Sequence, residues 1–388
     1  MDRCWASTGS SRALKRESQS RTPSIRERAD KSAMTYRHAD PAKGHHRHER
    51  LTVQSLEREV DETLLSPPKA DSYNSGLAEI LIKSCTMPMS PRCSDPVILN
   101  LWHAVGDIED MRPNHLYQTV LLEEPLSFAI DATGTAFVWH SRPSDRSGAT
   151  LNAAQVINEL PAKSIYGCLW TCLGEPSTDI FPIPEYFEPK RRNVSAGTIG
   201  VNVSAPRAIE NFLDMGHFPY VHTDVLGAEP HTEVKEYDVE ISSGRDEIIA
   251  TRCRFFQPRA SVASTEGDEI EYVYRVPHPY CSVLYKTSHV DESRQDVIAI
   301  FVQPVDQEHI RAHMMLCLID VDNSDAAIRK FQQLIFGQDK PILENQVPKR
   351  LPLDSRAETP IRADKSSVAY RRWLSQKGVT YGVIPAPI

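Results

Sequence analysis

Short runs of β-branched and aromatic residues alternate with turn residues after an N-terminal stretch that has no such pattern. Three runs, at residues 97–108, 117–140 and 164–174, are broken by Gly, Asp and Pro. This pattern predicts the strands of a small antiparallel domain. Within the second run, the letters DATG at residues 131–134 predict a hairpin turn.

A different pattern begins at about Pro184. Apolar residues recur at helical spacing over Ala205–Val221, which predicts a helix. Ser204 is its candidate N-cap, and Pro206 is tolerated because it falls in the first turn.

The rest of this second region combines strands with a late helix. Four apolar runs separated by turns predict four strands, at residues 270–276, 281–290, 296–305 and 310–321. A helix is predicted over Ala326–Gln346, with Asn323 or Ser324 as its cap. Its apolar stripe would consist of Ile328, Phe331, Leu334 and Ile335. Grouped strands with helices before and after them predict an α+β fold, one antiparallel sheet with helices packed on one face.

Composition divides the chain into three parts. Residues 1–92 are rich in Ser, Arg, Pro and His and have too few apolar positions to offset the entropy of ordering, so we expect them to be disordered. Residues 93–185 would form the small β domain and residues 186–388 the domain with the larger sheet.

Charge and cysteine usage exclude several classes of protein. The net charge is −8 and the pI about 6.0, so no global excess of basic residues indicates nucleic-acid binding. No secretory signal and no apolar run long enough to span a membrane is present. Eight cysteines in 388 residues do not suggest a disulfide framework. We therefore expect a cytoplasmic protein that binds neither membrane nor nucleic acid.

The stretch NFLDMGHFPYVH, residues 211–222, places three ionisable groups in an apolar run. On a helix, Asp214 and His217 would share a face. His217 and His222 are five residues apart and would be separated by roughly 140° around an ideal helix. A break at Pro219 could turn His222 back toward His217. The alternative is a hydrogen-bonded histidine pair in a core.

Two imidazoles and one carboxylate with open positions are typical of non-haem Fe(II) sites. The third ligand would be an Asp or Glu from another element. Asp339 is the first candidate because it follows the stripe of the late helix by one turn, and Pro341 just after it would distort that helix. Glu344 is the second candidate. The alternative for Asp339 is a solvated acid on a helix face.

These residues carry a resemblance to a known family. The spacing N-x-x-D-x-x-H-x-x-x-x-H, here Asn211, Asp214, His217 and His222, resembles the iron motif of Rieske-type non-haem iron oxygenases. The resemblance covers about residues 95–388, and the segments YRVPHPYCSVLYK and QDKPILENQVPKRLPLD resemble the catalytic components of bacterial 7-methylxanthine N-demethylases.

The resemblance implies a Rieske-like β domain followed by a helix-grip, START-like sheet. It also implies one Fe(II) held by His217, His222 and Asp339, with Asp214 passing electrons to the iron. Asn211 would belong to the surroundings of the iron or to the substrate pocket. A trimer-based homo- or hetero-oligomer is implied as well.

The chain departs from the family in its N-terminal domain. A [2Fe–2S] cluster needs the pairs C-x-H and C-x-x-H, and this sequence contains neither. Cys168 and Cys172 are interpreted as core thiols. We therefore predict a degenerate Rieske-like domain without a cluster, as in the resembling N-demethylases. Electrons would come from a Rieske-bearing reductase or a Rieske-bearing oxygenase subunit.

The sequence thus predicts an Fe(II) monooxygenase component that uses O2 to hydroxylate or N-demethylate a small heterocycle, methylxanthine-like or aromatic. A non-catalytic structural subunit, or a ligand-binding partner of an active oxygenase, is the first alternative. A zinc hydrolase that uses the same histidine pair is the second, although no Glu lies between the histidines to act as a base.

Overall fold

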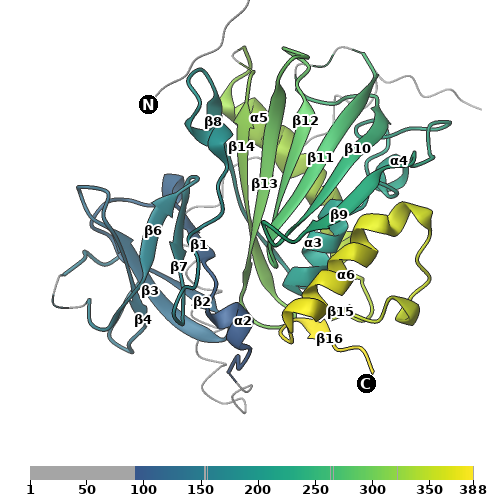
Figure 1. Cartoon of the computed structure of the whole chain (residues 1–388). Helices are drawn as coiled ribbons and strands as arrows, with labels where there is room; N and C mark the ends of the chain where they lie inside the picture. The colour runs from purple at the N-terminus through teal and green to yellow at the C-terminus, as the bar shows by residue number, and fades with distance from the viewer. Residues whose placement is uncertain are drawn as a thin grey trace, which may run out of the picture. The chain divides into compact units, whose positions relative to one another are not determined.

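The computed structural model describes residues 92–387, apart from residues 153, 155, 263, 265 and 321. All of the described residues belong to one compact unit (Figure 1). The predicted disorder of residues 1–92 lies, except for Arg92, outside the described residues and stays a prediction. Among the described residues, no helix is both long and apolar enough to cross a membrane.

Two small antiparallel sheets form the N-terminal part of this unit (Figure 1). One has the strand order β1-β7-β6 and the other the order β2-β3-β4-β5. Their strands are β1 (His103–Asp107), β2 (Tyr117–Leu121), β3 (Glu124–Ile130), β4 (Ala136–His140), β5 (Glu159–Leu160), β6 (Ala162–Ile165) and β7 (Cys168–Thr171).

The three predicted strand runs are confirmed here with one correction. The first run opens with a short helix, α2 (Pro96–Leu99), because the Asp95 carboxylate accepts hydrogen bonds from the amides of Val97 and Ile98. The predicted hairpin turn is present: the amide of Asp131 donates to the carbonyl of Thr135, and Gly134 adopts the left-handed φ of 85° that the turn requires.

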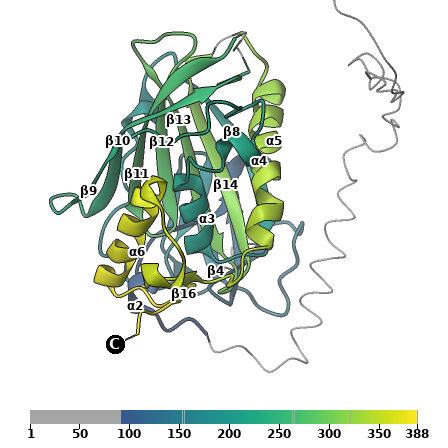
Figure 2. The same ribbon diagram turned by 90° about the vertical axis from the view of Figure 1, so that its right-hand side faces the viewer.

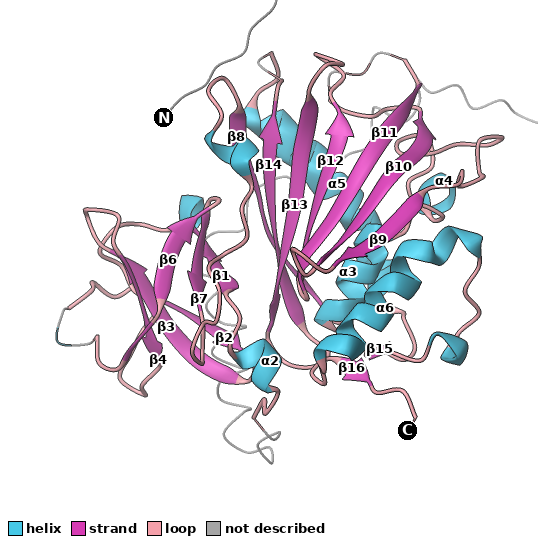
Figure 3. Cartoon of the chain, viewed as in Figure 1, coloured by secondary structure: helices cyan, strands magenta, loops and turns pink. Residues whose placement is uncertain are grey.

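A seven-stranded antiparallel sheet forms the rest of the unit, in the order β8-β14-β13-β12-β11-β10-β9 (Figure 3). The four predicted strands are confirmed as β11 (Asp268–His278), β12 (Cys281–Thr287), β13 (Gln295–Pro304) and β14 (Ile310–Leu318). Three more were not predicted: β8 (Arg192–Val201), β9 (Asp238–Ser242) and β10 (Glu247–Gln257). A parallel pair, β15 (Leu351–Pro352) and β16 (Val383–Ile384), lies near the C-terminus.

The two faces of the large sheet bury different partners, as β13 shows. Ile300 and Val302 pack in a core cluster with residues of the helices, whereas Ala299 and Phe301 pack in another with Trp170 of β7. Side chains of a strand alternate between the two faces of the sheet, so β13 contributes side chains to both core clusters. The predicted α+β class, with helices on one face, is confirmed (Figure 2). The boundaries at residues 93–185 and 186–388 stay a prediction, because both clusters draw residues from both parts.

The predicted helix over Ala205–Val221 is wrong in its second half. The structure has α3 (Ala205–Leu213), capped by Ser204 as predicted, and a separate short helix α4 (Phe218–Val221). The break falls at Asp214, whose extended backbone ends α3 and whose carboxylate accepts the amide of Gly216 at 2.7 Å. Pro219 lies in the first turn of α4, where a missing amide costs little, and therefore does not cause the break.

The late helix is α5 (Asp325–Glu344), capped by Ser324, one of the two predicted candidates. Its buried face consists of Ile328, Gln332, Phe336, Asp339 and Leu343. The predicted apolar stripe is therefore correct only at Ile328, and Leu334 is 52% exposed. The sequence pattern counted apolar residues alone and missed the two polar residues on the buried face. A further helix, α6 (Lys365–Lys377), was not predicted and ends at Gly378, whose φ is 75°.

Candidate metal centre

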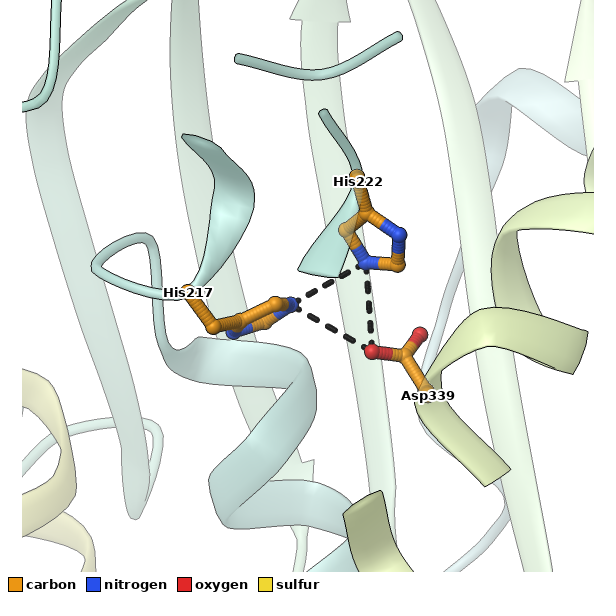
Figure 4. Close-up of side chains that lie close together, drawn as sticks. All are labelled: His217, His222 and Asp339. Atoms are coloured by element: carbon orange, nitrogen blue, oxygen red, sulfur yellow. Dashed lines mark hydrogen bonds and ion pairs between the residues drawn. The ribbon is translucent and has the colours of Figure 1, made fainter. Parts of the chain in front are cut away.

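His217, His222 and Asp339 converge on one point from two elements (Figure 4). The two histidines flank α4, and Asp339 projects from α5. The Nε2 atoms of the two histidines lie 3.1 Å apart. The Oδ1 atom of Asp339 lies 3.3 Å from Nε2 of His217 and 3.1 Å from Nε2 of His222. No other group of three or more His, Cys, Asp or Glu side chains comes together like this in the part of the chain that the structure describes.

The far nitrogens of both imidazoles fix their tautomers. The Nδ1–H of His217 donates to Asp214 Oδ2 at 2.9 Å, and the Nδ1–H of His222 donates to Gln338 Oε1 at 2.9 Å. In a neutral imidazole one nitrogen donates and the other accepts. When both rings are neutral, both Nε2 atoms therefore carry lone pairs, and these face each other and a carboxylate oxygen.

Three electron-rich atoms this close repel one another unless a proton or a metal cation lies between them. Burial opposes the ionisation of Asp339, but the two imidazoles outweigh it and hold the pKa of this carboxyl below its ordinary value. Its Oδ1 atom is buried and has no partner in hydrogen-bonding geometry. The donor set, two imidazoles and one carboxylate, fits a mononuclear non-haem iron.

The charge balance at His217 also favours a cation. Burial of this imidazole disfavours its protonation, but the carboxylates of Asp214 and Asp339 outweigh burial and raise its pKa to about 9. The same two carboxylates would favour a metal cation at Nε2. Outer carboxylate and amide partners that hold ligand histidines in this way are a general feature of metal sites.

The two histidines differ in their exposure. His222 is buried, whereas the His217 and Asp214 side chains keep 13% and 27% of their surface exposed. Both of the latter line a surface cavity of about 260 Å³, together with the ion-paired Arg207 and Arg371. The centre is thus buried on the His222 side and approachable through Asp214 on the other.

The structure brings together four of the sequence-predicted residues: Asp214, His217, His222 and Asp339. Asp214 and His217 meet across the turn between α3 and α4, and the expectation that they share a helical face is wrong. Glu344, the second candidate ligand, points elsewhere: it accepts the amide of Asn202 at 3.1 Å and pairs with Lys340.

Asn211 and Gln338 also lie close to the centre. Asn211 lines the cavity beside Asp214, and its carbonyl accepts the Asp214 amide at 3.1 Å. Sequence reasoning missed Gln338. Its position directly before Asp339 could have drawn attention to it, but adjacent residues on a helix point about 100° apart and rarely serve one site.

The cysteines of the small sheets lie in apolar surroundings. Cys168 of β7 and Cys172, just after it, are buried thiols in the core cluster that contains Trp170 and Phe301. Burial raises the pKa of the Cys168 thiol well above its usual range. Their prediction as core thiols agrees with this placement.

Comparison with known proteins places the chain in a family. Residues 201–378 match the family described as vanillate O-demethylase oxygenase C-terminal domain. The "Probable methylxanthine N7-demethylase NdmC" of Pseudomonas sp. strain TJI-51 is 49% identical over 285 residues, which cover 74% of this chain and 96% of that protein.

Solved structures show the same fold. The structure of NdmA from Pseudomonas putida CBB5 superposes with a TM-score of 0.57 at 21% identity, over 73% of this chain and 91% of that one. Dicamba monooxygenase bound to 3,6-dichlorosalicylic acid gives 0.56 at 14% identity, over 72% and 97%. The 49% identity to the N7-demethylase places the chain among the oxygenases, and iron is the cofactor that this family implies. The chain belongs to the Rieske-type non-haem iron oxygenases, the family that includes the methylxanthine N-demethylases.

Proposed function

We propose that this protein is the catalytic component of a methylxanthine N-demethylase that removes the N7-methyl group. The observation that carries the proposal is the centre itself, two Nε2 lone pairs and one carboxylate oxygen within 3.3 Å of one another. The substrate class is supported by the 49% identity to a protein named as a methylxanthine N7-demethylase.

The residues have separate roles in this proposal. His217, His222 and Asp339 would hold one Fe(II), which supplies the site for O2 activation when bound. Gln338 would fix the orientation of the His222 ring, and Asp214 that of the His217 ring. The aromatic ring of Phe218, with its centroid 5.1 Å from that of His217, would help to exclude water from the inner side of the centre.

The chemistry requires electrons from outside. One oxygen atom of O2 enters a C–H bond of the N-methyl group, and the other leaves as water with two electrons and two protons. The N-hydroxymethyl product then breaks its N–C bond and releases formaldehyde, with the proton returning to the ring nitrogen. The N7-demethylated xanthine is the second product.

A separate protein would supply these electrons. The 388-residue sequence has no C-x-H and no C-x-x-H pair, so we infer that this chain carries no [2Fe–2S] cluster of its own. A Rieske-bearing reductase or oxygenase subunit would then dock near the partly exposed Asp214, which lines the surface cavity and accepts a hydrogen bond from His217.

Demethylation of isomeric methylxanthines tests the proposal. The protein is loaded with Fe(II) and given hydrogen peroxide, which supplies the oxygen atom and both electrons without a partner. We expect formaldehyde and xanthine from 7-methylxanthine, less product from the 1- and 3-methyl isomers, and none with a His217→Ala, His222→Ala double variant. Stoichiometric iron without formaldehyde from any isomer would contradict the proposal.

A further inference from the structure

A buried lysine lies on the face of the large sheet that looks toward the metal centre. Lys286 of β12 is 7% exposed, and burial lowers the pKa of its ammonium group. It follows Leu284 on the same face, and Leu284 packs in the core cluster that contains residues of the helices. An ammonium group can donate three hydrogen bonds. Within the described residues the Lys286 Nζ atom has one hydrogen-bond acceptor, the carbonyl of Ala260.

Tyr272, beside Lys286, has a buried hydroxyl without a hydrogen-bond partner among the described residues. Tyr272 of β11 is the direct cross-strand partner of Lys286, so the two side chains stand next to each other on one face. Tyr272 is 1% exposed, and its hydroxyl has no hydrogen-bond partner among the described residues. A buried polar group without a partner is costly and calls for an explanation such as a ligand or an ordered water.

Tyr272 of this pair is separated from the metal centre by one side chain, that of Phe218. The ring of Tyr272 lies 6.4 Å from the ring of Phe218, measured between centroids. The Phe218 ring in turn lies 5.1 Å from that of His217 and 6.1 Å from that of His222. Phe255 of β10 is 5.4 Å from Phe218 and belongs to the same face.

These neighbours define the chemistry of a ligand. Both Lys286 and the Tyr272 hydroxyl can donate hydrogen bonds, so they favour an acceptor such as an oxo oxygen. The aromatic rings of Phe218, Phe255 and Tyr272 favour a flat ring system. An oxo-substituted heterocycle would satisfy both conditions, with its oxo group at the sheet and its methyl group toward the histidines.

We propose that Lys286 and Tyr272 determine substrate specificity by donating hydrogen bonds to a ring oxo oxygen of the substrate. The proposal rests on the proposed demethylase function and names the residues that orient its substrate. A purely structural role of Lys286, as a donor to Ala260 and a neighbour of Asp296 on β13, would explain the lysine but not the unused hydroxyl beside it.

Ligand binding tests this assignment without turnover. Calorimetry on the iron-loaded protein compares 7-methylxanthine with 7-methylpurine, which lacks both oxo groups. The variants are Lys286→Met and Tyr272→Phe. Tyr370→Phe is the control, since Tyr370 is also a buried tyrosine but its hydroxyl donates to the carbonyl of Pro279.

We expect Lys286→Met to weaken binding of 7-methylxanthine about 10- to 100-fold and Tyr272→Phe about 3- to 10-fold, because a hydrogen bond from a charged donor is the stronger one. Binding of 7-methylpurine should not change in either variant. Tyr272→Phe should keep or raise the melting temperature, because it removes an unsatisfied buried group. Tyr370→Phe should lower the melting temperature and leave both affinities unchanged.

The outcomes separate the two proposals. Wild-type protein that neither binds nor demethylates 7-methylxanthine would contradict the proposed function and this inference with it. Wild-type protein that does both, with variants that bind 7-methylxanthine equally well, would contradict the inference alone. Equal weakening for both ligands would also contradict it, because that result indicates lost packing. If Lys286→Met does not fold, the comparison of the two ligands on Tyr272→Phe decides.

Discussion

Buried histidines occur both in the metal centre and between the small sheets and the large one, in opposite surroundings. In the centre, each Nδ1–H has an acceptor, Asp214 or Gln338, and each Nε2 faces a carboxylate. His103 of β1 instead bonds the carbonyl of Ile98 through Nε2, and its Nδ1 has no partner among the described residues. Its ring contacts that of His278 at 5.5 Å.

The difference between the surroundings of His217 and those of His103 indicates which buried histidine is suited to bind a metal. Burial lowers the pKa of His103 to about 4, although the hydrogen bond to the carbonyl of Ile98 opposes it, and the ring is neutral at pH 7. At His217 two carboxylates overcome burial and raise the pKa to about 9. Carboxylates therefore favour a cation beside His217, whereas burial without a carboxylate disfavours one beside His103, although both side chains have little exposure.

The largest effect should come from removing the carboxylate that completes the centre. Loss of an outer partner costs about 10- to 100-fold in metal affinity or activity, so we expect Asp339→Ala to exceed this and to abolish turnover. Iron content after dialysis measures it. Glu344→Ala, on the same helix but paired with Lys340, is the control and should retain iron. Equal iron loss in both variants would mean that the helix, and not the ligand, was disturbed.

Replacing Asp214 should separate electron delivery from iron binding. Asp214→Asn keeps the size and one acceptor for the Nδ1–H of His217 but removes the charge. We expect iron content near normal, O2-driven turnover with the electron donor nearly abolished, and peroxide-driven turnover partly preserved. Measuring the iron content, the O2-driven activity and the peroxide-driven activity of the variant distinguishes electron delivery from iron binding. Iron lost in proportion to activity would show that Asp214 only orients His217.

A smaller effect is expected at Gln338, which the structure adds to the site. Gln338→Leu removes the acceptor of the His222 Nδ1–H, so the ring can turn and change its tautomer. We expect a loss of about 10- to 100-fold in metal affinity. Gln338→Glu keeps an acceptor and should bind iron at least as well as the native protein. Normal affinity in Gln338→Leu would show that packing alone orients His222.

The smallest effect concerns His103, far from the chemistry. Its folded pKa of about 4 lies below the ordinary 6.5, so between these values the unfolded chain binds more protons and stability falls as pH falls. The slope should be about 1 kcal/mol per pH unit for this group. Denaturant unfolding at pH 7 and pH 5 measures it, and His103→Gln should reduce the loss. Equal acid sensitivity in both proteins would assign the effect to other groups such as His278.

Much of the fold could be predicted because it follows from local patterns. Apolar runs separated by turns predicted β11 to β14, and the candidate caps, Ser204 for α3 and Asn323 or Ser324 for α5, predicted where these helices begin. The break after α3 was misplaced because its cause is a side-chain contact of Asp214 with a backbone amide, and Pro219 was the more visible signal.

The candidate site was predicted from spacing, and its supporting contacts could not be. The spacing of His217 and His222 and the position of Asp339 on a late helix made these residues candidates, and the resemblance to the iron motif selected them over the alternatives. Gln338 and the pair Lys286 and Tyr272 depend on tertiary packing: one joins α5 to α4, and the others meet through the register of β11 and β12. Nothing in the local sequence marks such contacts.

The central claim is that this oxygenase holds a mononuclear iron and no cluster of its own. Iron and acid-labile sulfide should be assayed together on the purified full-length protein after loading with Fe(II) and sulfide, with a His217→Ala, His222→Ala double variant in parallel. The account predicts stoichiometric iron without sulfide in the native protein and neither in the variant. Stoichiometric sulfide, or iron retained in full by the double variant, would contradict it.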